Sequence, residues 1–256
     1  MTLPNSLQIF GENRVFSSQL AVSSGALSAE NLRDRDPDAC WRSSGSSDSV
    51  QEYAKFLFRD GAGQSAPYAF DRVLLLNTNI KNFSAVYYTS ADGTASSAVP
   101  ELAAAANTGS DALFELSAPA FTPRGFGLFM QTTQTANAEK QIGGIKLCKH
   151  LLTLDALTTF DRRDYAREGS YYLAGGELVR WREFTRFGGT LTVKNLSKAG
   201  RDQLWAAYRD YDFLTLAFFT DYDLRQTYDV AVSAPPQETF DRKTQLYELS
   251  LEVKER

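Results

Sequence analysis

Apolar and polar residues alternate in short segments through the first 150 residues of the chain. The stretch from Gln51 to Phe58 is an example, and turn-forming residues such as Ala91-Asp92-Gly93 separate such segments. Because successive side chains of a strand point to opposite faces, this pattern predicts strands packed on a core. The strands are expected at residues 51–58, 70–76, 84–89, 126–131 and 142–148, with residues 43–49 and 99–106 as flexible loops.

The second half of the chain has a different pattern. Ser197 precedes a stripe formed by Leu204, Trp205 and Tyr208, which predicts an N-capped helix over residues 198–208. Residues 151–167 read as a connector and Gly188-Gly189 as a turn. Strands are expected at residues 178–187, 190–193, 214–219, 228–233 and 246–253, the last with Leu249, Leu251 and Val253 on one face.

These patterns predict an all-β protein of two β-sandwich domains. The first covers residues 1–150, and the second covers residues 151–256 and carries the one helix. A chain of 256 residues is long enough for two domains that each bury a core.

Composition excludes several classes of function. The net charge is −4 with no basic tract, so we expect no nucleic-acid partner. No apolar run approaches the roughly 20 residues that span a bilayer, and the N-terminus lacks the pattern of a secretion signal, so we expect synthesis in a cytoplasm and no membrane insertion. Cys40 and Cys148 favour buried, reduced thiols over a disulfide, and His150 favours a structural role.

The chain carries no motif of a catalytic site. It has no phosphate-binding loop, dinucleotide turn, nucleophile elbow or metalloprotease motif, and its single histidine leaves little room for zinc or triad chemistry. A glycosidase needs two carboxylates across a cleft, and no motif selects such a pair. We therefore predict a protein that is not an enzyme, with no catalytic residue and no metal ligand.

The segment Asp34–Trp41 is a compact acidic loop ending in a large ring. With the lead Ala29-Glu30-Asn31, it resembles the Asp-Gly-Asp-Pro-x-Thr-x-Trp loop of the discoidin family, which includes the coagulation-factor type C and galactose-binding-like carbohydrate-binding modules. The resemblance covers about residues 25–150. It implies a galactose-binding-like jelly roll with Asp34 and Asp36 in a structural loop and Trp41 in the core.

The family often holds a structural calcium ion in this loop, and this chain departs from that pattern. Arg35 replaces the glycine, Ala39 replaces the threonine, and Gly143 or Gly144 replaces the late glutamate. Calcium requires six or more oxygen ligands, so the loss of two ligands and the gain of a cation argue against it. We expect no cofactor.

The resemblance also implies a sugar-binding site formed by side chains on loops of the first domain. Such a site needs an aromatic platform with hydrogen-bonding side chains beside it, and Trp41 is excluded because it takes the core position. The candidates, each of which can also be read as ordinary surface, are Arg42, Tyr68, Asn79, Asn82 and Arg124.

Residues 170–256 are similar to domains of bacteriophage tail-tip and baseplate proteins, through residues 187–193, the helix, and the strands at 214–219 and 246–253. This resemblance implies a non-catalytic virion component that assembles with other tail subunits as a homo-oligomer, with the first domain as a spacer or a contact to cell-surface glycans. Tyr211, Tyr222 and Tyr228 belong either to the core of the second domain or to such an interface. The alternative function is a carbohydrate-binding protein or an accessory module of a glycan-active enzyme.

Overall fold

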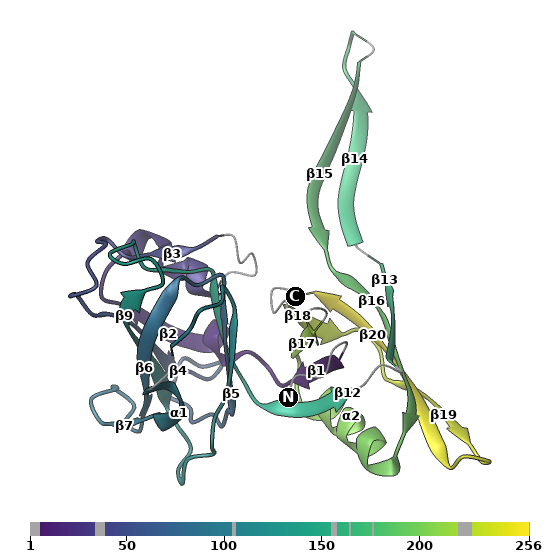
Figure 1. The fold of residues 1–256 in the computed structure, drawn as a ribbon. Coiled ribbons are helices and arrows are strands. Elements are labelled where there is room, and N and C mark those ends of the chain that lie inside the picture. Colours follow the sequence, from purple (N-terminus) through teal and green to yellow (C-terminus); the bar gives the residue numbers. More distant parts are fainter. Residues whose placement is uncertain are drawn as a thin grey trace. The chain divides into compact units, whose positions relative to one another are not determined.

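A computed structural model of the chain describes residues 6–33, 39–103, 106–154, 158–163, 165–175, 177–219 and 227–255 (Figure 1). The fold is all-β, as predicted, and it divides into two compact units. The N-terminal unit comprises Asn13–His150, and the C-terminal unit contains the described residues up to Glu12 and those after His150. No helix in these ranges is long and apolar enough to cross a membrane.

The N-terminal unit is built from two main antiparallel sheets with the core between them. The five-stranded sheet has the order β2 (Ser18–Val22), β4 (Glu52–Phe58), β9 (Gly125–Thr133), β6 (Ile80–Tyr88) and β7 (Ser96–Ala98). The three-stranded sheet has the order β11 (Gly144–Cys148), β5 (Arg72–Leu76) and β8 (Ala112–Glu115). A short pair joins β3 (Trp41–Arg42) to β10 (Gln141–Ile142), and η1 (Arg14–Ser17), η2 (Ala26–Arg33) and α1 (Pro100–Ala103) complete the unit.

The core of this unit explains its strand sequences. Phe56 and Leu128 of the five-stranded sheet belong to the same buried cluster as Val73, Leu75 and Leu147 of the three-stranded sheet. β5 and β11 are buried along nearly their whole length, whereas β4 exposes Tyr53 on its outer face. The three-stranded sheet is therefore buried along β5 and β11, whereas the five-stranded sheet has an outer face that reaches solvent.

The C-terminal unit contains one eight-stranded antiparallel sheet within the described ranges. Its order is β12 (His150–Leu154), β1 (Ser6–Phe10), β17 (Leu214–Phe219), β18 (Thr227–Val232), β20 (Leu246–Glu255), β16 (Gly188–Leu196) and β13 (Thr158–Arg162), and β19 (Gln237–Asp241) pairs with β20. A separate hairpin of β14 (Tyr165–Tyr172) and β15 (Leu178–Arg186) extends away from this sheet (Figure 1).

Helix α2 (Lys198–Asp210) packs on this sheet against β16 and β20. Ser197 is its N-cap, as predicted, and accepts a hydrogen bond from the backbone N–H of Gly200 at 3.2 Å. Leu204 and Ala207 are buried and join the cluster that contains the inward side of β20. That side consists of Leu249, Leu251 and Val253, the alternation expected from the sequence.

Several expectations for the local structure were wrong. Gly188 and Gly189 do not form a turn but begin β16, where Gly189 has φ +154° and pairs with Val253. A Cβ atom at Gly189 would lie 2.2 Å from the backbone oxygen of Asp161, so the glycine permits close approach of β13 and not a reversal. The expected connector at residues 151–167 contains β12, β13 and the start of β14, and the loop at 99–106 contains α1.

The N-terminal boundary of the first domain also differs from expectation. Strand β1 pairs along its whole length with β17, from Ser6 opposite Phe219 to Phe10 opposite Thr215. The first strand of the chain therefore belongs to the C-terminal unit, and the N-terminal unit begins at Asn13. Pairing between strands so distant in sequence leaves no local signal in the alternation pattern.

Candidate functional site

Two of the predicted sugar-binding residues lie together beside Glu139. The guanidinium of Arg42 pairs with the Glu139 carboxylate at 3.1 Å, and the Asn79 side chain donates to the Glu139 backbone oxygen at 2.7 Å. The Asn79 oxygen also accepts from the backbone N–H of Gln141 at 2.9 Å. Both ends of the Asn79 amide group therefore bind the segment that contains Glu139 and Gln141.

Asp48 fixes the same end of the sandwich. Its carboxylate accepts hydrogen bonds from the backbone N–H of Asn137 at 3.0 Å and from both the backbone and the hydroxyl of Thr133. These bonds, the one from Asn137 foremost, hold the pKa of Asp48 below its usual range. The buried Lys140 donates to the backbone oxygen of Ser47 at 2.8 Å. The loop at residues 43–49, expected to be flexible, is thus anchored by Asp48 and Lys140.

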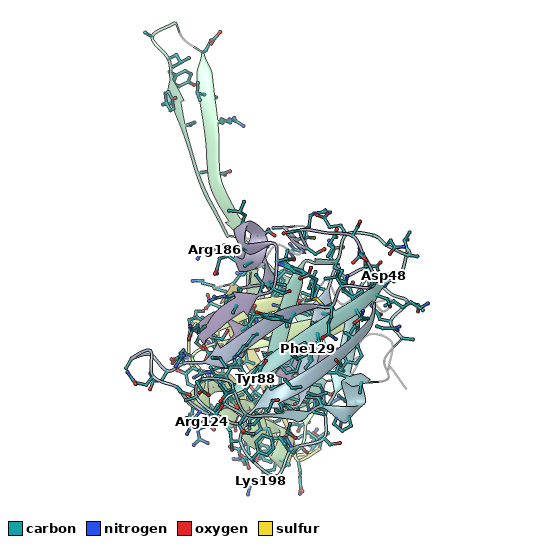
Figure 2. All side chains as sticks on the ribbon, turned by 90° about the vertical axis from the view of Figure 1, so that its left-hand side faces the viewer. Asp48, Tyr88, Arg124, Phe129, Arg186 and Lys198 are labelled. Carbon is teal, nitrogen blue, oxygen red and sulfur yellow. The ribbon has the colours of Figure 1, made fainter. Side chains whose placement is uncertain are left out.

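Tyr68 and Arg124 lie at the opposite end of the five-stranded sheet. Arg124 directly precedes β9, whereas Thr133, which bonds to Asp48, is the last residue of that strand. Figure 2 shows Arg124 and Asp48 on either side of a sheet face that bears Tyr88 and Phe129. Arg124 donates to the backbone oxygen of Ser65 at 3.2 Å, and the backbone N–H of Tyr68 donates to Pro123 at 2.8 Å.

The five residues that were predicted to bind sugar therefore do not form one site. Arg42 and Asn79 occupy one end of the sandwich, and Tyr68 and Arg124 occupy the other. Asn82 lies exposed on β6, opposite Thr132 of β9.

The remaining predicted positions are structural where the structure describes them. Trp41 is fully buried, and its indole N–H donates to the backbone oxygen of Ser24 at 3.1 Å. Tyr211 follows α2 and its backbone N–H donates to Ala207 at 3.2 Å. The ring of Tyr228 stacks on Phe187 with 3.7 Å between centroids. Asp34, Asp36 and Tyr222 lie outside the described residues.

A cavity of about 240 Å³ opens beside Arg124, and we call it the Phe121 cavity. Its mouth carries Phe121, whose side chain is 37% exposed, and its polar lining includes Asp71, Thr122 and Lys149. The other lining residues are small or apolar: Ala69, Phe70, Ala118, Pro119, Ala120 and Pro123.

The wall of the Phe121 cavity is held in place by the ends of β5 and β11. The Asp71 carboxylate accepts from the backbone N–H of His150 at 2.7 Å, and the Asp71 backbone N–H donates to Cys148 at 3.1 Å. The loop that carries Phe121 is tied at its start, where the N–H of Leu116 donates to the Asp71 backbone oxygen at 2.9 Å. Asp71 therefore keeps a fixed orientation relative to the loop.

A tyrosine lies beneath the aromatic lining. The ring of Tyr87 is buried, with its centroid 5.6 Å from that of Phe70 and 6.1 Å from that of Phe121. Its hydroxyl has no hydrogen-bond partner among the described residues. The pKa of Tyr87 is raised to about 12, mainly by burial and to a smaller extent by the negative charges of Glu101 and Asp71. The hydroxyl therefore stays protonated at neutral pH.

The Phe121 cavity offers a flat apolar ring, a carboxylate that accepts hydrogen bonds and an ammonium that donates them. Ligand pockets commonly combine an apolar lining with a few polar groups that fix orientation. No group of three or more His, Cys, Asp or Glu side chains suited to a metal occurs in the described part of the chain. Cys40 and Cys148 are both buried and are not joined in a disulfide.

Sequence reasoning missed Phe121, Asp71 and Lys149. The available signal was the segment Ser117–Arg124, in which two prolines and two alanines surround one aromatic residue. Such a segment predicts a rigid loop, and an aromatic side chain held on a rigid loop is a candidate for the lining of a ligand pocket.

No family model matches the chain, and no curated protein matches it. Similar solved structures include a putative alpha-L-fucosidase from Bacteroides thetaiotaomicron (15% identity, TM-score 0.44), of whose chain this protein covers 29%. They also include CpGH89CBM32-6 produced by Clostridium perfringens (17% identity, TM-score 0.43), of whose chain this protein covers 99%. A chitosan-binding module from Paenibacillus sp. IK-5 (13% identity, TM-score 0.41) is covered over 98% of its chain. Each match covers 53–54% of this chain. These structures include carbohydrate-binding modules.

Proposed function

We propose that this protein binds carbohydrate without catalysis, and that the Phe121 cavity is the binding site. A pyranose ring has an apolar face of C–H groups and a rim of hydroxyls. The cavity presents the matching pair of features, since an exposed ring lies beside the carboxylate of Asp71 and the ammonium of Lys149. This juxtaposition at one strand end is the observation that carries the proposal.

In the proposed complex the sugar face packs on Phe121, while its hydroxyls donate to Asp71 and accept from Lys149. Hydrogen bonds to charged groups are stronger than neutral ones, so these two residues fix the orientation of the ring. Asp71 is the single carboxylate in the lining of the cavity, whereas glycoside hydrolysis normally uses two. The chemistry available is therefore recognition.

A glycan array probed with the full-length protein and with Phe121→Ala tests the proposal. The wild-type protein should bind a defined set of glycans, and the variant should lose at least about tenfold in affinity because the apolar platform is removed. Leu27→Ala is the matched control, since Leu27 is also an exposed apolar side chain of the N-terminal unit and lies outside the cavity. Equal binding by wild type and Phe121→Ala would contradict the proposed site.

A second candidate function is assembly, in which the chain is a subunit of a phage tail tip or a related particle and is carried in the virion. The hairpin of β14 and β15 favours this function. It pairs with no other described strand, and an isolated two-stranded hairpin is only marginally stable in water. The ends of its strands and the residue after β14 expose large apolar side chains: Tyr171, Tyr172, Leu173 and Leu178.

Covering these side chains in an assembly would bury apolar surface and pair the open strand edges. Light scattering should therefore show a discrete oligomer for the wild-type protein, and the triple variant Tyr171→Ser, Tyr172→Ser, Leu173→Ser should shift its mass to the monomer. Phe240→Ser, at an exposed site on β19, is the matched control. A variant that retains the wild-type mass would rule out the hairpin as the interface.

A further inference from the structure

The C-terminal unit carries a cavity of about 370 Å³ between α2 and β19, which we call the Trp205 cavity. Four of its five lining residues come from α2 and one comes from β19. Arg201, Trp205 and Arg209 are spaced four residues apart and so share one face of the helix. Asp202 and Glu238 complete the lining.

Most of the lining is held in a fixed arrangement. The indole N–H of Trp205 donates to the Glu238 carboxylate at 2.8 Å, and Arg201 pairs with the same oxygen at 3.7 Å. Arg201 also contacts Asp202 at 3.0 Å and lies over the ring of Tyr247, 4.7 Å from its centroid. These contacts orient the indole ring and engage Arg201 with the carboxylates of Asp202 and Glu238.

Arg209 differs from the other charged residues of the Trp205 cavity. Its side chain is exposed on the last turn of α2, and no hydrogen bond or ion pair engages that side chain within the described part of the chain. Its guanidinium offers a planar fork of donors that matches a carboxylate. The cavity thus has an uncommitted cation, an aromatic wall, and two carboxylates that retain acceptor oxygens.

We propose that the Trp205 cavity binds a hexuronate, a sugar ring that carries a carboxylate. The ligand carboxylate pairs with Arg209, the ring hydroxyls donate to Asp202 and Glu238, and the apolar ring face packs on Trp205. A neutral sugar has hydroxyls but no carboxylate, so it would leave the Arg209 guanidinium without an anionic partner. A flat aromatic acid leaves both carboxylates without a donor. This site is separate from the Phe121 cavity and does not depend on carbohydrate binding there.

The test is a ¹H–¹⁵N NMR titration of the full-length protein, followed at the indole N–H of Trp205 and assigned with Trp205→Phe. D-glucuronate should shift this signal in a saturable way. D-glucose, which carries CH₂OH in place of the carboxylate, should bind at least about tenfold more weakly, as expected for loss of one charge-assisted pair. Benzoate should also bind more weakly than glucuronate.

Arg209→Gln should remove the preference for glucuronate over glucose, whereas Arg242→Gln, at an exposed position in the turn after β19, should keep it. Phe121→Ala should leave the titration unchanged, so failure at one cavity is distinguishable from failure at the other. Three results would overturn the proposal: no shift with glucuronate, equal affinity for glucose, or benzoate binding as tight as glucuronate.

Discussion

At the scale of single residues, Tyr87 shows how the Phe121 cavity differs from ordinary core. The phenol lies among aromatic rings, yet its hydroxyl has no hydrogen-bond partner among the described residues. An unsatisfied buried hydroxyl costs about 1–3 kcal/mol, and such costs persist in proteins mainly where function requires them. The ring centroid of Tyr87 lies 6.1 Å from that of Phe121, so the phenol packs against the aromatic wall of the proposed ligand site.

Replacing Tyr87 with Phe should therefore stabilise the folded protein. We expect the free energy of unfolding to rise by about 1 kcal/mol at pH 7, because the variant buries no unpaired hydroxyl. The difference should grow above pH 10. The pKa of Tyr87 is about 12 in the folded protein and about 10 in the unfolded chain. The unfolded wild-type chain therefore loses the proton first, and the folded state loses stability as the pH rises above about 10.

Urea unfolding of wild type and Tyr87→Phe at pH 7 and pH 11 measures both effects. Tyr53→Phe, at an exposed tyrosine of the same unit, should change the free energy of unfolding by less than about 0.5 kcal/mol at pH 7. A loss of stability in Tyr87→Phe would show that the hydroxyl has a partner in the folded protein.

The resemblance of residues 34–41 to a family loop predicted the core position of Trp41, but residue types alone could not locate the site. Arg42 and Asn79 have side chains of the kind that bind sugars, and the structure shows their polar groups bonded to Glu139 and Gln141. Asp71 and Lys149 become neighbours of Phe121 only when β5, β11 and the proline-rich loop meet at one end of the sandwich. That meeting depends on strand pairing, which composition does not encode.

At the scale of elements, alternation identified the strands that have one buried face. β4, β9 and β20 follow the expected segments because their inward side chains are apolar. β7 and β19 were missed because their residues are exposed throughout, so backbone pairing and not burial defines them as strands. The helix was found because a capping residue and an apolar stripe agreed.

The N-cap of α2 is open to a direct test. Ser197→Ala removes the acceptor for the Gly200 N–H and should lower the free energy of unfolding of the C-terminal unit by about 1 kcal/mol. Lys198→Ala changes the next residue, which is exposed, and should have little effect. Chemical denaturation followed by circular dichroism measures both variants, and equal stability of Ser197→Ala and wild type would show that the cap contributes nothing.

At the scale of the whole molecule, the two units are not consecutive in sequence. The chain starts in the C-terminal unit with β1, passes through the entire N-terminal unit, and returns at β12, which lies beside β1 in the sheet. Strand β1 pairs with β12 and β17, and its Leu7 and Ile9 belong to the C-terminal core, so the described sheets of the N-terminal unit do not include it. The C-terminal unit is not complete without it.

A variant that begins at Asn13 after an initiator methionine should separate the two units energetically. It loses the buried side chains of Leu7, Ile9 and Phe10 and every hydrogen bond between β1 and β17, so the C-terminal unit should unfold or melt at a much lower temperature. The N-terminal unit should keep its melting temperature. Calorimetry resolves the two transitions, and the indole signals of Trp41 and Trp205 report on the units separately.

Ile9→Ala provides a milder version of the same test. The residue is fully buried in the C-terminal core, so the substitution should cost that unit about 2–5 kcal/mol and leave the Trp41 signal unchanged. If either variant destabilised the N-terminal unit alone, β1 would belong to that unit and the division at Asn13 would be wrong. If both left the C-terminal transition intact, the pairing of β1 with β17 would contribute nothing to the stability of the sheet.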